Sequence, residues 1–212
     1  KEYAKKIQEN VYVGPSYSNK DIELFLNYKN IPYENLETHT LLQKTAKLIM
    51  EQNIIGWYQG RMEWGPRALG NRSILGDPRD GNMKDILNEK IKHRESFRPF
   101  APSIMEEFVS EYFDISIPSP YMLMVAPVKK PKEIPAVTHI DGTGRLQTVS
   151  KESNPLYYEL ISEFYKLTKI PVLINTSMNV KGEPITSYAG SSLGANSYRR
   201  LARELIFRGG AK

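Results

Sequence analysis

The chain has 212 residues, 40% of them hydrophobic, which allows one large domain or two small ones with a substantial core. It has no cysteine, which excludes disulfides and thiolate metal sites and fits a reducing compartment. No apolar run is long enough to span a membrane, and residues 1–10 lack the apolar core of a signal peptide. We therefore expect a cytoplasmic protein.

The net charge of +5 is unevenly distributed. Residues 186–212 contain one acidic residue, Glu204, against five basic residues: Arg199, Arg200, Arg203, Arg208 and Lys212. The rest of the chain is therefore nearly neutral. This distribution favours a small anionic ligand over a long polyanion, which needs a broad basic face.

Strand and helix patterns alternate along the chain. The first half predicts a strand at 11–15, a helix over about 19–28 capped by Ser18, a helix from Thr38 or Thr40 to about Gln52, and an apolar strand at 54–60. The second half predicts a helix over 80–93, a strand at 100–105, a short acidic helix to about 113, strands over 121–128 and 145–150, a helix over 155–167 and a buried strand at 170–175. This order predicts an α/β fold with a mixed sheet.

The stretch from Gly60 to Ser103 combines glycines at 60, 65, 70 and 76 with six arginines, Arg61, Arg67, Arg72, Arg79, Arg94 and Arg98. Glycine allows close backbone approach to a ligand, and arginine presents a planar fork of donors that matches phosphate or carboxylate. Apolar residues such as Trp64 and Phe100 alternate with these arginines, which argues against a solvated basic face. We interpret the stretch as a site for a multiply charged anion.

Three further groups carry candidate site residues. Lys92, Arg94 and Arg98 follow one helix and can converge on a phosphate, unless they are surface cations that complement the helix dipole. Arg145 and Gln147 share one face of a strand. Asn175, Ser177 and Asn179 follow a buried strand, where α/β folds bind ligands, although an ordinary polar turn is the alternative.

Other common sites are not indicated. The Walker A and GxGxxG spacings are missing, so a nucleotide must be held by side chains and irregular loops. His139 and Asp141 are too few for a metal site, and Asp141-Gly142 predicts a turn. Ser177 lacks the surroundings of a serine nucleophile. We assign no metal ligand.

Taken together, the chain resembles the C-terminal region of the O-carbamoyltransferases typified by the nodulation, tobramycin and cephamycin enzymes. The matching segments are VYVGPSYSN at 11–19, GRMEWGPRALGNRSILGDPR at 60–79, LNEKIKHRESFRPFAPS at 87–103, THIDGTGRLQTV at 138–149 and NTSMNVKGEPI at 175–185. The resemblance implies a YrdC-like twisted mixed sheet flanked by helices over 11–185. The Lys-x-Arg and Ser-x-Asn signatures of the family look like Lys92/Arg94 and Ser177/Asn179.

The resemblance also implies a function. Such a domain binds carbamoyl phosphate and ATP with Mg²⁺, forms carbamoyl-adenylate, and releases phosphate and pyrophosphate. Combined with the candidates found above from the residues themselves, this function assigns the catalytic role to Lys92, Arg94 and Arg98. It assigns substrate and ATP binding to Arg61, Arg67, Arg72, Arg145, Gln147, Asn175, Ser177 and Asn179. A partner N-terminal lobe of the same enzyme, with a metal site, would transfer the carbamoyl group to a hydroxylated small-molecule acceptor.

Residues at both ends depart from this pattern. Residues 1–10 are interpreted as the end of a preceding linker, and 186–212 as an atypical tail, either a foreign addition or a divergent end. Two alternatives stay open. One is a threonylcarbamoyl-adenylate synthase of the YrdC type, which would use threonine and bicarbonate for tRNA modification. The other is a non-enzymatic RNA-binding module, against which the near-neutral body of the chain counts.

Overall fold

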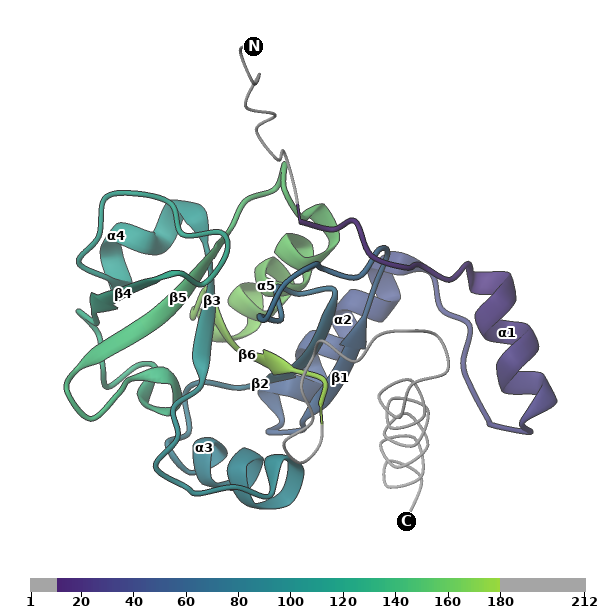
Figure 1. Ribbon diagram of the computed structural model, residues 1–212, viewed down its shortest axis with the longest axis horizontal. Helices are drawn as coiled ribbons and strands as arrows, with labels where there is room; N and C mark the ends of the chain where they lie inside the picture. Colours follow the sequence, from purple (N-terminus) through teal and green to yellow (C-terminus); the bar gives the residue numbers. More distant parts are fainter. Residues whose placement is uncertain (1–10, 180–212) are drawn as a thin grey trace, which may run out of the picture.

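A computed structural model describes residues 11–179, and the termini at 1–10 and 180–212 lie outside the described part. The fold is a six-stranded mixed sheet flanked by helices (Figure 1), as the sequence predicts. The strands are β1 (Ile55–Tyr58), β2 (Arg72–Gly76), β3 (Ala101–Met105), β4 (Met124–Pro127), β5 (Thr143–Val149) and β6 (Val172–Ser177). Their order across the sheet is β1-β2-β6-β3-β5-β4.

Neighbouring strands are antiparallel except β3 and β5, which are parallel. Tyr58 pairs with Arg72, and Ser73 pairs with Ser177. Because β3 also runs antiparallel to β6, the starts of β2, β3 and β5 and the ends of β1 and β6 meet at one edge of the sheet. We call this edge the site edge, because the polar residues described below gather there.

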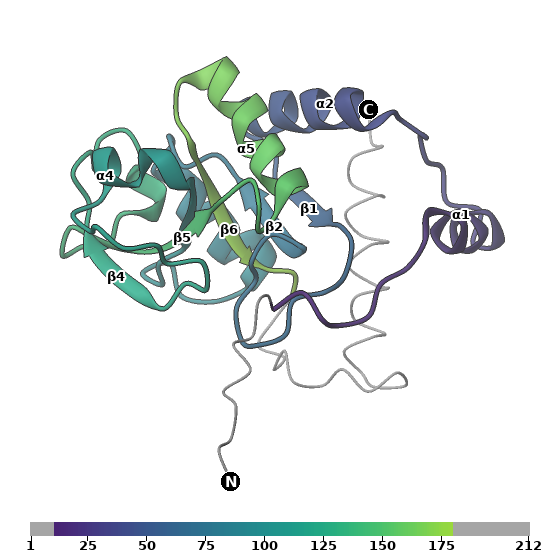
Figure 2. The same ribbon diagram turned by 90° about the horizontal axis from the view of Figure 1, so that it is seen from above.

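The longer helices are α1 (Asn19–Tyr28), α2 (Thr38–Met50) and α5 (Pro155–Thr168). Helices α2 and α5 pack side by side over one face of the sheet (Figure 2). A capping box between Ser18 and Asp21 starts α1, which carries no buried residue and projects from the body of the molecule (Figure 1). Asn154 caps α5, with Pro155 at the first helical position.

The other face is covered near β2 and β6 by α3 (Asn82–Ile86) and the π-helix η1 (Leu87–Lys92). Their Met83 and Leu87 lie beside Ile174 of β6, whereas the next residue, Asn175, points to the opposite face. The remaining short elements are the 3₁₀-helices η2 (Glu106–Phe108) and η3 (Pro135–Val137) and the helix α4 (Val109–Tyr112). Within the described residues, no helix is long and apolar enough to span a membrane.

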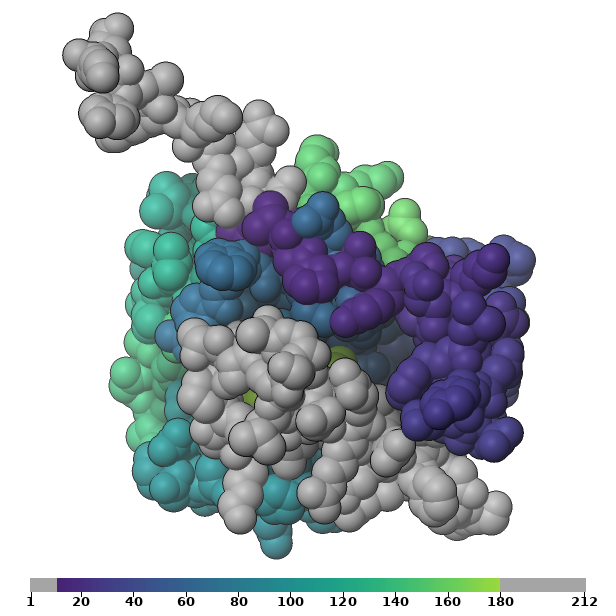
Figure 3. Space-filling view, turned by 45° about the vertical axis from the view of Figure 1, so that its right-hand side comes forward, coloured from purple at the N-terminus to yellow at the C-terminus, as the bar shows by residue number. Residues whose placement is uncertain are grey.

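Three sequence predictions need correction. Residues 11–15 form no strand but an extended segment bonded to the arginine-rich stretch, where Gly14 N donates to Met62 O at 2.9 Å and Trp64 N to Val11 O at 2.7 Å. Figure 3 shows this purple segment lying across the molecule beside blue atoms. The predicted helix over 80–93 divides into α3 and the wider turn of η1, and the buried strand β2 inside the arginine-rich stretch was not predicted.

Candidate anion-binding site

The site edge brings together the residues proposed from the sequence. The loop before β2 carries Arg61 and Arg67, and the segment before β3 carries Arg94 and Arg98. The sheet itself contributes Arg72, Arg145, Gln147, Asn175 and Ser177, with Lys92 and Asn179 close to the end of β6. Segments that are far apart in sequence therefore bring most of their cations to the site edge, because the strand pairing of the mixed sheet aligns these strand ends.

Lys92 is one of two buried cations of this group, together with Arg72, and has 6% of its surface exposed. Its Nζ donates to Ser177 O, to Asn179 O at 2.9 Å and to Asn179 Oδ1 at 3.0 Å, and Ser177 Oγ lies 3.5 Å away. Burial, and to a smaller extent the charge of Arg94, lower the pKa of Lys92 to about 7. These acceptors are uncharged oxygens, so they orient the ammonium group without neutralising it.

The Lys-x-Arg and Ser-x-Asn segments are therefore in direct contact. Ser177 Oγ also donates to Asn179 Oδ1, so the two residues form one polar turn around the lysine. The end of β6 supplies this turn, and the end of η1 supplies Lys92. An anion that approached Lys92 would favour its charged form and reverse the effect of burial on its pKa.

Arg94 lies beside Lys92 and is held from two sides. Its Nε donates to Asn88 Oδ1 at 2.7 Å, and its guanidinium lies over the ring of Phe100, 5.0 Å from the centroid. Burial and then the charge of Arg98 lower the pKa of Arg94, while Glu95 acts in the opposite direction. Arg98 itself is exposed and forms an ion pair with Glu95 at 2.9 Å.

A second pair of cations comes from the loop before β2 and from β5. Arg67 is exposed and lies close enough to Arg145 for its charge to affect the half-buried Arg145. Burial first, and then Arg67, lower the pKa of Arg145. The Nε of Arg145 is buried and has no hydrogen-bond partner among the described residues. Two like charges held together in this way form a suitable place for an anion.

Arg61 and Arg72 are engaged by the protein itself. Arg61 Nε donates to Gly14 O at 3.0 Å and its Nη2 to Val13 O at 2.6 Å, so it ties the extended segment to the loop. Arg72 is buried at the start of β2, with Nη1 3.5 Å from the sulfur of Met62. Contact of these two arginines with a ligand stays a prediction.

Gln147 and Asn175 lie in a buried amide network under the loop before β2. Gln147 Nε2 donates to Leu69 O at 2.9 Å, and Asn175 Nδ2 donates to Ala68 O at 3.2 Å. Asn175 Nδ2 and Ser103 Oγ both donate to Gln147 Oε1, at 3.0 and 2.7 Å. The amides therefore fix the backbone next to Arg67, and their direct binding of a ligand stays a prediction.

Sequence reasoning missed other residues that hold the same loop. The buried Glu63 Oε1 accepts from Leu69 N at 2.6 Å, and Tyr12 Oη donates to Leu69 O at 3.0 Å. Asn154 Nδ2 donates to Asn71 Oδ1 at 2.8 Å. The helix-capping position before Pro155 was a usable signal for Asn154, whereas nothing in the local pattern indicates which backbone groups Glu63 and Tyr12 reach.

Arg79 belongs to the other edge of the sheet. It follows the end of β2, and its Nη2 donates to the fully buried Asp77 at 2.6 Å. Gln52 donates to the same carboxylate at 2.8 Å, and Arg79 Nη2 also reaches Met50 O. Of the six arginines in the stretch, this one therefore pairs its half-buried side chain with a buried carboxylate away from the site edge.

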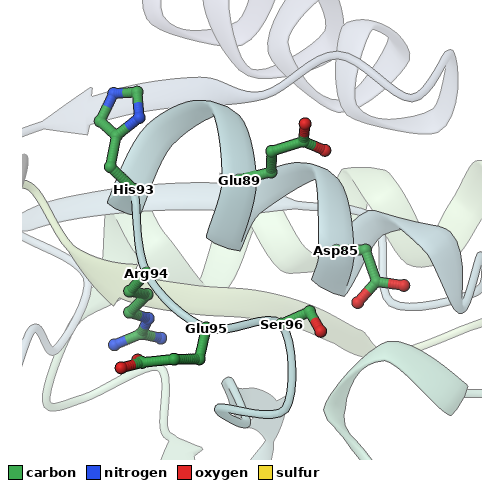
Figure 4. Close-up of a pocket in the computed structure, with 6 residues that line it drawn as sticks. All are labelled: Asp85, Glu89, His93, Arg94, Glu95 and Ser96. Atoms are coloured by element: carbon green, nitrogen blue, oxygen red, sulfur yellow. The ribbon is translucent and has the colours of Figure 1, made fainter.

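An open depression of about 520 Å³ adjoins the site and includes Arg94 in its lining (Figure 4). Its other lining residues are Asp85, Glu89, His93, Glu95 and Ser96. In Figure 4 the Arg94 guanidinium and the Glu95 carboxylate lie side by side below η1, while His93 points away from them. Among residues 11–179, no group of three or more His, Asp or Glu side chains is arranged to hold a metal ion.

Comparison with known proteins gives a family match. The sequence profile of the family described as "Carbamoyltransferase C-terminus" matches residues 46–201. One curated relative is the uncharacterized protein sll1178 from Synechocystis, with 45% identity over 82% of this chain. The nodulation protein NolO from Bradyrhizobium diazoefficiens has 43% identity over 86% of this chain. The nodulation protein NolNO from Sinorhizobium fredii has 45% identity over 85% of this chain. The matches cover 32%, 34% and 27% of these relatives, so the chain spans about a third of their length.

One solved structure is also similar, at a lower level. It is full-length HypF in its phosphate- and nucleotide-bound form, with 18% identity and a TM-score of 0.48 over 77% of this chain and 20% of HypF.

Proposed function

Because this chain belongs to the carbamoyltransferase C-terminal family, we propose that it is the part of a carbamoyltransferase that binds carbamoyl phosphate and ATP. In this proposal it forms carbamoyl-adenylate, and the remainder of a longer polypeptide transfers the carbamoyl group to a hydroxylated small molecule. The relatives, which are about three times as long as the matched region, leave room for such a transfer lobe.

The observation that carries the proposal is a set of cations without carboxylate partners. Within residues 11–179, the ion pairs within 4.0 Å involve neither Lys92 nor Arg67 nor Arg145. Burial lowers the pKa of Lys92 and of Arg145, so the fold keeps both groups where their charged forms are disfavoured. A bound anion would remove this cost, which is the energetic reason to expect phosphate groups here.

The chemistry needs two anions to be held together. Water attacks the phosphorus of carbamoyl phosphate, the bond between phosphorus and the carbamoyl oxygen breaks, and carbamate and dihydrogen phosphate form, so both protons of the water stay on the phosphate. The carbamate oxygen then attacks the α-phosphorus of ATP, and pyrophosphate leaves. Carbamate is already anionic, so we assign no general base. The main tasks of the protein are to oppose the repulsion between the substrates and to hold their reacting atoms close.

The roles divide among the residues of the site edge. Lys92, Arg94 and Arg98 would neutralise charge that develops on the leaving groups, and Ser177 and Asn179 would bond phosphate or carbamoyl oxygens. Arg67 and Arg145, with Arg61 and Arg72, would bind the second set of phosphates. Mg²⁺ would enter with the phosphates of ATP, as it usually does at nucleotide sites.

Calorimetric titration with carbamoyl phosphate, and separately with ATP and Mg²⁺, tests the proposal. We expect both ligands to bind, and Arg94→Ala to weaken binding by about tenfold or more, the usual size for a charge-assisted contact. Lys90→Ala is the matched control, since it removes one exposed cation from the π-helix η1, which directly precedes the Arg94 segment.

Two results would contradict the proposal. One is that the folded chain binds neither ligand, or binds them equally well after Arg94→Ala. The other is that threonine with bicarbonate, rather than carbamoyl phosphate, supports pyrophosphate release from ATP.

A further inference from the structure

The π-helix η1 contains a fully buried asparagine, Asn88, whose side chain forms hydrogen bonds to the segment that follows the helix. Its Oδ1 accepts from Arg94 Nε at 2.7 Å, and its Nδ2 donates to Ser96 O at 3.2 Å and to Arg98 O at 2.9 Å. One side chain therefore binds a guanidinium and two backbone carbonyls of the loop before β3. A buried amide needs such hydrogen-bond partners, so the side chain of Asn88 holds the loop in place and the loop in turn fixes the orientation of the Asn88 amide.

The backbone of the same residue takes part in the arrangement. Asn88 O accepts the π-type bond from His93 N and also a bond from Arg94 N at 3.1 Å. His93 has a left-handed backbone with φ 47°, which turns the chain back toward the helix. The wider π turn and this reversal bring Arg94 beside Asn88 although six residues separate them.

This contact leaves the arginine fork available. The bond to Asn88 uses Nε, and the face of the guanidinium lies over Phe100, so the terminal Nη groups are the donors left for a ligand. A free arginine side chain would lose considerable rotamer entropy on binding an anion. Holding the guanidinium in place beforehand removes part of that cost.

We propose that Asn88 is a positioning residue that presents the Nη groups of Arg94 to the phosphate of the anionic substrate. The inference rests on the function proposed above, in which Arg94 contacts that phosphate. Asn88 touches no ligand in this proposal and acts through Arg94.

A double-mutant cycle in the 212-residue chain tests this inference, with the affinity for carbamoyl phosphate as the readout. We expect Asn88→Ala to weaken binding about tenfold, as for loss of a bond to a charged group, and to change it less than about twofold when Arg94 is already alanine. Leu160→Ala, which removes a fully buried side chain of α5, controls for loss of stability and should leave the affinity of the folded chain unchanged.

NMR of the Arg94 Nε–H group gives a second readout that needs no ligand. Wild type and Asn88→Asp, which keeps an acceptor oxygen, should show an Nε–H protected from solvent exchange, and Asn88→Ala should lose the protection. Equal protection in Asn88→Ala, or an equal loss of affinity in the two backgrounds, would overturn the inference. By contrast, an Arg94→Ala chain that binds as tightly as wild type would contradict the proposed function while leaving the Nε–H result to stand.

Discussion

Because the pKa of Lys92 is low, we expect the proposed anion binding to depend on pH. In the free protein burial lowers this pKa to about 7, so Lys92 is about half protonated at pH 7 and about nine-tenths neutral at pH 8. An anion bound beside it favours the ammonium form and returns the pKa toward 10.5, its ordinary value. Binding above pH 7 therefore takes up a proton.

The size of the effect follows from proton linkage. We expect an uptake of about 0.5 proton at pH 7 and about 0.9 at pH 8, so affinity should fall by up to about tenfold for each pH unit above 8. This slope corresponds to about 1.4 kcal/mol of binding free energy per pH unit. Below pH 6 Lys92 is already charged, and this contribution to the pH dependence should vanish.

Calorimetry in buffers of different ionisation enthalpy measures the uptake directly. Carbamoyl phosphate has its own ionisation, but the difference between wild type and Lys92→Met cancels it. Lys90→Ala, which removes an exposed cation two residues away, should keep the wild-type uptake. If wild type and Lys92→Met take up the same number of protons at pH 8, Lys92 does not titrate with the ligand and the reasoning fails.

The same group affects folding. Its native pKa lies below that of the unfolded chain, so between about pH 7 and pH 10.5 the unfolded chain binds more protons and stability rises with pH. Lys92→Met should therefore remove up to about 1.4 kcal/mol per pH unit from the slope of the unfolding free energy in this window. Urea denaturation between pH 7 and pH 9 measures this slope. If the slope is the same in wild type and Lys92→Met, the native fold does not lower the pKa of Lys92.

Two further predictions concern stability alone. Arg79→Ala should reduce the unfolding free energy measured in urea by about 3 kcal/mol, because Asp77 would stay buried without its cation. Ligand affinity should not change, and a loss of stability below about 1 kcal/mol would contradict this prediction. Gly70→Ala should cost about 3 kcal/mol or more in thermal unfolding, because φ is 101° and a Cβ would lie 2.2 Å from the Tyr157 ring. Gly142→Ala, with φ 77° and open space, should cost only about 1 kcal/mol, and equal losses would refute the steric argument.

The sequence predicted those elements whose signals are local. The cap at Ser18 and the apolar spacing of residues 38–50 placed α1 and α2, and the Asn154-Pro155 start agrees with the predicted start of α5. These signals depend on bonds within one or two turns, so they need no knowledge of the rest of the fold. The arginine- and glycine-rich stretch likewise indicated an anion site by residue type alone.

The strand β2 shows where local signals fail. RSILG is buried on both sides, so it has no alternation of apolar and polar residues, and it begins with an arginine. Its identity as a strand depends on pairing with β1 and with β6, about a hundred residues away. The strand prediction for residues 11–15 was wrong for the opposite reason. The apolar residues of this segment are typical of a strand, but its backbone forms hydrogen bonds to a loop.

Caps, periodicity and glycine positions act over a few residues, so the amino-acid sequence is enough to predict much of the local structure. The contacts of each cation, in contrast, depend on the packing of the whole chain. Arg79 and Arg67 have similar glycine- and proline-rich neighbours, yet Arg79 forms an ion pair with the buried Asp77 and Arg67 lies beside Arg145. The low pKa of Lys92 likewise arises where β6 brings Ser177 over it, since burial is a property of the packed chain.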